Sequence, residues 1–304
     1  MTIITRRKFL QSASASVACT AALFDSAGLY ASPFGLPIAL QLYSVRQMLA
    51  LDFAGTLKLI AGIGYREVES AGYFNHSARE VGSALQAAGL QMPSAHFPHD
   101  ELSRDFDQIL EFNKAIGVRY IICSFPGLKD PGRIKDPSFE KIVQSFTMED
   151  WRWNAEEFNK MGEKVRGAGM AFGYHNHTME FGRQGGIVPF EELLRLTDRS
   201  LVTIELDCGW VVVGGGDPVY YLERYADRIS MLHVKDFKKT DKPVSVVSPP
   251  PAEELGRGTI DYRRIFAAAK KARIKHCFVE QEDYDIPVME ALKIDADYMK
   301  NFKA

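Results

Sequence analysis

The sequence predicts an α/β protein, a single-domain (β/α)8 barrel of the TIM type. Eight short apolar segments rich in β-forming residues recur along the chain, with helix-like segments between them. Such alternation is typical of parallel β/α units. Several intervals between successive strands are about 26 to 31 residues, the size of one strand–helix repeat, and the chain length of 304 residues suits a barrel.

The expected strands cover residues 37–43, 65–69, 91–96, 118–123, 171–177, 202–207, 229–234 and 275–280. The clearest helical patterns cover residues 49–61, 81–88 and 102–116, and a further helix is expected to start at Trp151. A doubly wound open sheet is the competing fold, but no Gly-x-Gly-x-x-Gly follows the first strand. Residues 124–150 and 238–258 form the longest connections, and long loops after barrel strands usually cover the active site.

The first 31 residues are expected to form a targeting segment, with a frayed basic tail as the alternative. Arg6 and Arg7 precede Phe9 and Leu10, and a mildly apolar run rich in alanine and serine follows. This pattern resembles a twin-arginine export signal, and the run is too short for a membrane span. We therefore expect a periplasmic protein whose barrel covers residues 36–304, with no membrane span in the mature chain.

The composition is that of an ordinary globular protein, with 46% hydrophobic residues, 25% charged residues and a net charge of −2. A charge so close to zero gives no electrostatic footprint for nucleic acid or for an anionic membrane surface. The four cysteines are scattered and form no CxxC pair, which argues against a zinc ribbon and against a disulfide framework.

Polar side chains stand at nearly every expected strand end. His175 and His177 lie two residues apart, so in a strand both point to one face, and Glu180 follows just beyond. Because chemistry in a TIM barrel belongs to the C-terminal ends of the strands, one geometry would bring these side chains together. The other strand-end residues are Glu69, His96, Asp207, His233 with Lys235 and Asp236, and Glu280 with Glu282.

Each of these residues also has a simpler interpretation. His96 alone is compatible with a hydrogen-bonded loop residue, Glu69 with a helix cap or salt bridge, and Lys235–Asp236 with a solvated pair. The set on the last four strands is harder to explain in that way. Carboxylates and imidazoles without a thiolate pair favour one divalent ion, with Mn²⁺, Mg²⁺, Co²⁺, Fe²⁺ and Zn²⁺ all open. Such an ion can polarise a carbonyl and stabilise an enediolate while a carboxylate moves the proton.

Several of these segments resemble the sugar isomerase/epimerase family with a xylose-isomerase-like TIM barrel, which is related in fold to the AP endonucleases. The resemblance covers the chain from about residue 36 to its end and is weak on substrate. It rests on residues 40–46, 64–69, 173–181, 205–210, 232–236, 255–261 and 279–282, among them the His175-Asn-His177 and Glu205-Leu-Asp207 stretches.

The resemblance implies a metal site made of Glu180, Asp207, His233 and Glu280, with His177 as the substitute if a nitrogen ligand replaces Glu180. In family epimerases two metal-bound glutamates exchange the substrate proton from opposite sides, and Glu180 and Glu280 would be that pair. The His-Asn-His form is also similar to members that act on 3-keto-glycosides, where His175 or His177 would serve as the base.

The resemblance also implies residues that hold the substrate. Tyr43 and Trp210 are expected to stack on a sugar face, and Lys235 to hold a substrate oxygen. Glu69 and His96 are further candidates, and Glu282 shares a strand face with Glu280 and could exchange roles with it.

The leading hypothesis is a metal-dependent sugar isomerase or epimerase working by proton transfer next to a carbonyl, on a free sugar or keto-glycoside. The alternatives are a 3-keto-glycoside lyase or hydratase with the same metal site, phosphodiester cleavage of the AP endonuclease type, and an exported sugar-binding barrel without activity. Phosphodiester cleavage would need more histidines and a basic surface. Barrels of this kind often pair through their helices, so a homo-oligomer stays among the expected states.

Overall fold

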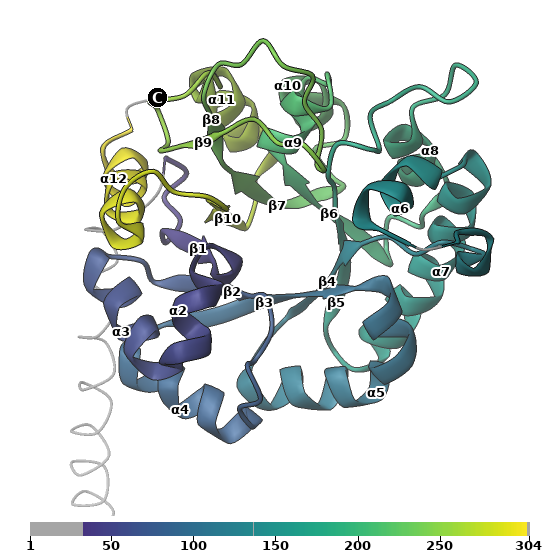
Figure 1. The fold of residues 1–304 in the computed structure, drawn as a ribbon. Helices are drawn as coiled ribbons and strands as arrows, with labels where there is room; N and C mark the ends of the chain where they lie inside the picture. The colour runs from purple at the N-terminus through teal and green to yellow at the C-terminus, as the bar shows by residue number, and fades with distance from the viewer. Residues whose placement is uncertain (1–32, 136, 303–304) are drawn as a thin grey trace, which may run out of the picture.

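A closed barrel of eight parallel strands forms the middle of the molecule, and helices surround it (Figure 1). The computed structural model describes residues 33–135 and 137–302, so the predicted export signal at residues 1–31 lies outside the described residues. Around the barrel the strands follow the order β1-β10-β7-β6-β5-β4-β3-β2. They are β1 (Ala39–Gln41), β2 (Glu67–Ser70), β3 (Gln91–Pro98), β4 (Tyr120–Phe125), β5 (Ala171–His175), β6 (Val202–Asp207), β7 (Ile229–Val234) and β10 (His276–Val279).

The predicted fold class is confirmed, and each expected strand overlaps one strand of the barrel. Four strands, β1, β2, β5 and β10, are shorter than expected. A 3-10 helix, η2 (Leu42–Val45), follows β1 at once, so Tyr43 lies in a turn. The fifth strand ends at His175, which places His177 beyond the strand. No helix in the described part of the chain is both long and apolar enough to cross a membrane.

The outer helices alternate with the strands, and shorter helices lie in the connections (Figure 1). Residues of α7 illustrate the contact: Phe158 lies against Phe172 and Tyr174 of β5, with ring centroids 5.8 and 4.9 Å apart. The helices are α2 (Arg46–Leu51), α3 (Phe53–Ile63), α4 (Ala78–Ala88), α5 (His99–Ile116), η3 (Pro131–Arg133), α6 (Phe139–Ser145), α7 (Met148–Gly167), α8 (Pro189–Leu196), α9 (Cys208–Val213), α10 (Pro218–Arg224), α11 (Tyr262–Ala272) and α12 (Val288–Asn301).

The barrel interior is filled in layers. A small apolar cluster of Ala39, Tyr120, Ile122, Met231 and Phe278 occupies its middle. Burial of large apolar side chains like these contributes about 1.5–3 kcal/mol each. The much larger apolar core lies outside the barrel, between strands and helices. The polar strand-end residues are therefore separated from the bottom of the barrel by a dry layer.

The bottom of the barrel carries a separate buried pair. The Nδ1 atom of His276 lies 2.6 Å from the Oε2 atom of Glu67, and both residues are less than a tenth exposed. Arg119 approaches the other ring nitrogen of His276 at 3.3 Å. Residues at the N-terminal face of a TIM barrel generally serve stability, which is the role this pair fits.

Buried aspartates fix the two long connections. Asp150 caps α7 together with Thr147, and it also accepts hydrogen bonds from the Lys129 backbone and the Arg133 guanidinium. The helix thus starts at Met148, three residues before the expected Trp151, because the cap lies there.

The second long connection leaves β7 and forms a two-stranded antiparallel sheet, β8 (Asp236–Phe237) with β9 (Ala252–Glu253). Asp236 accepts hydrogen bonds from the backbone N–H groups of Phe237, Gly256, Gly258 and Ile260. A Cβ atom on Gly258 would lie 2.2 Å from the Asp236 carboxylate, so only glycine lets the backbone approach this closely.

Asp295 of α12 gives the stability of the fold a pH dependence. Its Oδ1 atom accepts a hydrogen bond from the Leu255 N–H, and burial raises its pKa to about 8. Between the ordinary aspartate pKa of about 4 and about 8, the unfolded chain is ionised at Asp295 while the folded chain keeps the proton. We therefore predict that the free energy of unfolding of the wild type falls relative to Asp295→Asn as the pH rises through this window. Denaturant titrations at several pH values measure this difference.

Asp297→Asn, on the exposed side of the same helix, is the matched control. An equal pH-dependent difference in both variants, or none in Asp295→Asn, would contradict the role of the buried carboxyl.

Candidate metal centre

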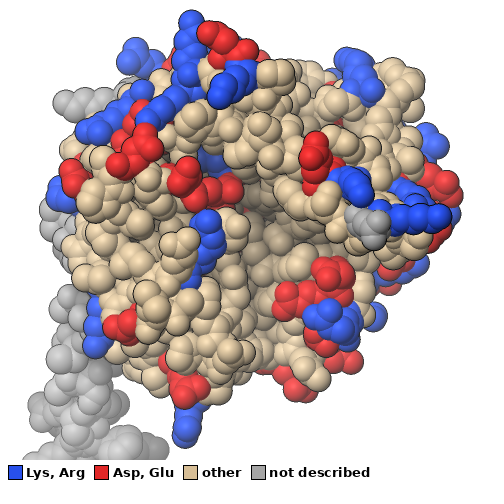
Figure 2. Space-filling view, in the orientation of Figure 1, with Lys and Arg blue, Asp and Glu red and all other residues tan. Residues whose placement is uncertain are grey.

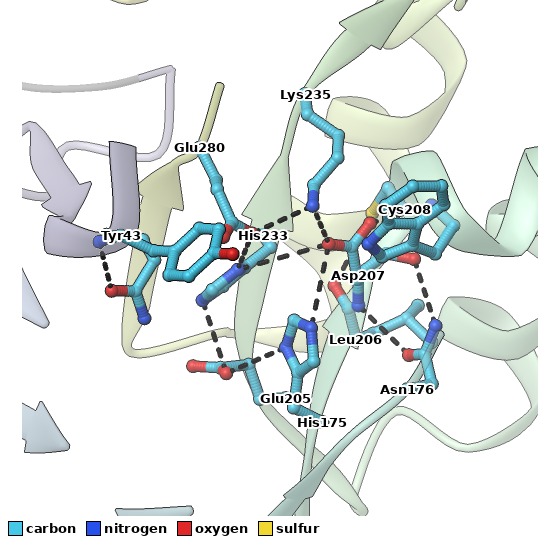
Figure 3. A network of polar contacts seen from close by, with 12 residues as sticks. Tyr43, His175, Asn176, Glu205, Leu206, Asp207, Cys208, His233, Lys235 and Glu280 are labelled. Carbon is cyan, nitrogen blue, oxygen red and sulfur yellow. Dashed lines mark hydrogen bonds and ion pairs between the residues drawn. The ribbon is translucent and has the colours of Figure 1, made fainter. Parts of the chain in front are cut away.

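Four side chains from four strands converge at the C-terminal end of the barrel. His175, Asp207 and His233 end or nearly end β5, β6 and β7, and Glu280 follows β10 directly. One ligand atom from each can be chosen so that all lie within 4.8 Å of one another, and all four residues are buried. We call these four residues the upper group. Figure 3 shows them pointing toward one another from their separate strands.

The upper group fits a divalent metal ion. It offers two imidazole nitrogens and two carboxylates, a donor set that suits Zn²⁺, Fe²⁺, Co²⁺ or Mn²⁺. The Oδ2 atom of Asp207 is buried without a hydrogen-bond partner, and its near neighbours are the Lys235 ammonium at 3.0 Å and the imidazoles of the group, so it is placed to coordinate an ion. The Nδ1 atom of His233 lies 2.9 Å from Glu280 and 4.0 Å from Asp207, and the Nε2 atom of His175 lies 3.8 Å from Asp207. Ligand atoms separated by these distances could all contact one ion placed between them.

Local backbone structure sets the position of Asp207. Its Oδ1 atom accepts the Trp210 N–H at 2.7 Å and so caps α9, which leaves Oδ2 facing the group. The side chain of Asn176 bonds the backbone of Asp207 in both directions: its Oδ1 accepts the Asp207 N–H at 3.0 Å, and its Nδ2 donates to the Asp207 carbonyl at 3.2 Å. This amide clasp joins the ends of β5 and β6 (Figure 3).

Lys235 lies at the edge of the upper group and contacts two of its carboxylates. Its Nζ atom lies 3.0 Å from Asp207, 2.8 Å from Glu280 and 2.7 Å from Glu282. Burial lowers the pKa of Lys235, but the three carboxylates outweigh burial and raise it well above the ordinary value. The same ammonium lies 4.6 Å from the centre of the Trp210 ring. It is therefore a charged donor at the edge of the site.

Glu180, the predicted first ligand, lies on the other side of β5. Its Oε1 atom accepts hydrogen bonds from the Tyr174 hydroxyl at 2.5 Å and from the His177 N–H at 2.9 Å. Tyr174 points out of the barrel against Phe158, because alternate residues of a strand face opposite sides. On this geometry the first ligand of the proposed set is revised from Glu180 to His175.

His177 lies beside the upper group without joining it. Its ring centre is 5.1 Å from that of His175, and its Nδ1 atom is buried without a hydrogen-bond partner. Burial, and then the charge of Lys235, lower the pKa of His177 to about 3. The two histidines therefore have different positions, which the spacing of two residues did not reveal.

Glu69, His96 and Glu205 lie deeper in the barrel. Glu69 is fully buried and contacts His233, His96, Gln41 and Ser94, so the structure places it beneath the site, away from the substrate surface. Burial lowers the pKa of His96, but the carboxylates of Glu69 and Glu205 raise it to about 9. Sequence analysis gave Glu205 no role, although it stands two residues before Asp207 on the same strand face.

A cavity of about 590 Å³ opens from the upper group to the surface. Figure 2 shows the hollow in the middle of this face, with mostly uncharged surface inside. Tyr43, Trp210 and Glu282, which were predicted to contact a substrate, line this cavity, and His96 and His177 line it too. None of the described residues that line the cavity is lysine or arginine. Sequence analysis did not identify the aromatic side chains Phe125 and Phe139 on the wall formed by β4 and α6.

Comparison with known proteins identifies the family. Residues 57–302 match the family model of the xylose isomerase-like TIM barrel. The chain belongs to this family. An inosose dehydratase of Clostridium botulinum is 28% identical over 235 residues, which cover 70% of this chain and 76% of the relative. An inosose dehydratase of Geobacillus thermodenitrificans is 27% identical over 254 residues, covering 77% and 83%.

Two solved structures superpose on this chain along most of its length. A sugar phosphate isomerase/epimerase from Parabacteroides distasonis superposes with a TM-score of 0.66 at 26% identity, covering 86% of this chain and 93% of that one. The IOLI protein, solved with a bound zinc atom, superposes with a TM-score of 0.66 at 14% identity, covering 86% and 96%. At that identity the second likeness concerns the fold alone.

The revised ligand set predicts which variants bind metal. Replacing His175 with alanine should weaken binding of Zn²⁺ or Mn²⁺ by at least about 100-fold, more than the loss of an outer-shell partner, because a ligand atom is removed. Glu180→Gln should keep the affinity, because that side chain faces away from the upper group. Competition against a chelator measures both affinities, and retention by His175→Ala with loss in Glu180→Gln would restore the original assignment.

Proposed function

We propose that this chain is a divalent-metal-dependent lyase that removes a proton next to a carbonyl of a keto-sugar, keto-glycoside or related cyclic ketone and eliminates the oxygen substituent on the next carbon. The observation that carries the proposal is the position of Glu180. Because it bonds outward to Tyr174, Glu180 does not face Glu280 across the site, as proton exchange of the epimerase kind would require. A histidine stands where the first of them was expected.

The remaining side chains suit an elimination. A bound divalent ion at the upper group would polarise the substrate carbonyl and so acidify the neighbouring C–H bond. His177 lines the cavity and is placed to take that proton. As the C–H electrons form the new double bond, the C–O bond at the next carbon breaks, and the ammonium of Lys235 can protonate the departing oxygen. The products are an unsaturated ketone and water or an alcohol.

The cavity supports a neutral, hydroxyl-rich substrate. Phosphate groups are held by arginine, lysine or helix N-termini, and none of the described residues that line the cavity is arginine or lysine. Aromatic rings such as Tyr43 and Phe139, which are 40% and 50% exposed, give apolar faces for sugar C–H groups. The relatives named inosose dehydratase are in keeping with elimination of water. The predicted export signal would place this activity in the periplasm.

Sugar isomerisation or epimerisation is the second candidate. It is favoured by the likeness at 26% identity to a protein named sugar phosphate isomerase/epimerase. Glu282 shares the cavity with Glu280 and would have to supply the second proton-transfer group.

Product analysis in D2O separates these functions. The metal-loaded protein would be incubated with 3-keto-glycosides, inosose and simple ketoses, and the products followed by ultraviolet absorbance and mass spectrometry. An unsaturated ketone with loss of water or alcohol supports the lyase. Deuterium exchange or a new epimer without elimination would establish the second candidate, and binding of sugars without either reaction would indicate a barrel without activity.

Lys235 provides a test within the site. Lys235→Met should lower kcat for the elimination by about 10²–10⁴-fold, the range typical of general acid–base groups, while metal is retained. Lys238→Met is the matched control, because Lys238 pairs with Asp285 on the outer part of the same connection. Equal effects of both substitutions, or no effect of Lys235→Met, would contradict the assigned role.

A further inference from the structure

A second buried set of polar side chains lies directly beneath the upper group. The Oε2 atom of Glu205 lies 2.6 Å from His96 Nε2, 3.1 Å from His175 Nδ1 and 3.2 Å from His233 Nε2. Glu69 adds contacts of 2.7 Å to His233 Nε2 and 3.0 Å to His96 Nε2. We call Glu69, His96 and Glu205 the lower group. The ligand atoms of His96, His175, Glu205 and His233 also lie within 4.8 Å of one another, so distance alone would allow a second ion here.

The two groups share two imidazole rings, and each ring turns one nitrogen to each group (Figure 3). His175 directs Nδ1 to Glu205 and Nε2 toward Asp207. His233 directs Nε2 to Glu69 and Glu205, and Nδ1 to Glu280 and Asp207. A neutral imidazole has one N–H donor and one nitrogen with a free lone pair, and only the second can bind a metal ion.

Carboxylates lie on both sides of each ring, so these contacts alone do not choose the nitrogen that carries the hydrogen. An ion at the upper group would take the lone pairs of the nitrogens that face Asp207 and Glu280, because a metal ion binds only a nitrogen without a hydrogen. The one N–H left on each ring would then donate to the lower group, to Glu205 from His175 and to Glu69 and Glu205 from His233. A second ion in the lower group would instead need both rings to bind metal through both nitrogens, with no N–H left on either ring.

Resting on the metal site of the proposed function, we infer that Glu205 is the positioning residue of the metal centre, that it fixes the tautomer and orientation of both His175 and His233, and that the lower group holds hydrogen bonds in place of a second ion. Glu205 is suited to this role because it is fully buried and one of its oxygens meets both rings. Glu69 supports only His233 of the two. Outer partners of this kind typically contribute 10–100-fold to metal affinity.

The barrel contains a matched control for this role. Glu67 is also a buried glutamate on a barrel strand and also contacts an imidazole, His276, at 2.6 Å. That pair lies at the opposite end of the barrel, beyond the apolar middle layer, so it cannot orient a residue of the upper group. Substitution of either glutamate by glutamine removes one buried carboxylate that holds a histidine, but only Glu205→Gln touches the proposed ligands.

The experiment titrates wild type, Glu205→Gln and Glu67→Gln with Zn²⁺ in competition with a chelator, and with Co²⁺ while the visible absorption spectrum is recorded. Thermal unfolding of the metal-free proteins shows whether each variant folds. We expect one ion per chain in all three, Zn²⁺ affinity weaker by 10–100-fold in Glu205→Gln alone, and a changed Co²⁺ spectrum in that variant only, because the uncharged amide oxygen of glutamine holds the N–H groups of both rings more weakly than the carboxylate does.

Equal affinity and spectra for Glu205→Gln and wild type, or equal losses in both variants, would overturn the inference. Two ions in the wild type and one in Glu205→Gln would also overturn it, since the lower group would then be a metal site. These readouts do not depend on turnover. A wild type that binds one ion as described but eliminates nothing from any ketone would refute the proposed function and leave the positioning role intact, whereas a wild type that binds no ion would refute both.

Discussion

Charge balance inside a closed barrel is the constraint on which the rest of this structure depends. Glu69, Glu205 and Asp207 are completely buried, and burying an ion without a partner costs several kcal/mol. The chain meets this constraint by setting acids and bases side by side at the strand ends, so that each of these three carboxylates faces an imidazole or the ammonium of Lys235. The order of polar residues along the sequence follows from that requirement as much as from chemistry. An apolar layer beneath them keeps the network at one end of the barrel.

The sequence predicted the barrel, and it grouped three of the four residues of the candidate metal centre, because both depend on regular patterns. Strand ends in a TIM barrel converge whatever the side chains are, so Asp207, His233 and Glu280 could be grouped without coordinates. The positions of Glu180 and Glu205 could not be predicted in this way. Glu180 lies beyond the end of its strand at His175, and its side chain turns outward to the Tyr174 hydroxyl, a direction that residue spacing does not reveal. Glu205 did have a signal, its two-residue alternation with Asp207, but a buried acid whose partners come from distant strands resembles an ordinary strand residue in the sequence.

The walls of the cavity are held by the same device on two sides. Asp150 and Asp236 are buried carboxylates that collect backbone N–H groups or a guanidinium from connections that have little regular structure of their own. Each of these carboxylates therefore fixes the backbone of a loop by hydrogen bonds, as the bonds between strands fix the barrel. A site whose walls are fixed in this way is preorganised, and binding does not have to supply the conformational entropy of ordering them. The position of the Lys235 backbone is fixed in this way, because Asp236 is the next residue along the chain.

The amide clasp of Asn176 has a consequence for how such a protein can diversify. Because it grips the Asp207 main chain and no side chain of the loops, it holds the ends of β5 and β6 in register irrespective of what the following segments contain. Insertions, deletions or grafted sequences after either strand can then change the shape of the pocket while the ligand atoms stay where they are. The carboxamide of Asn176 thus allows the loops, which shape the pocket, to change while the ligand residues keep their positions. Loop exchange between relatives is therefore the natural route to new substrates on this scaffold.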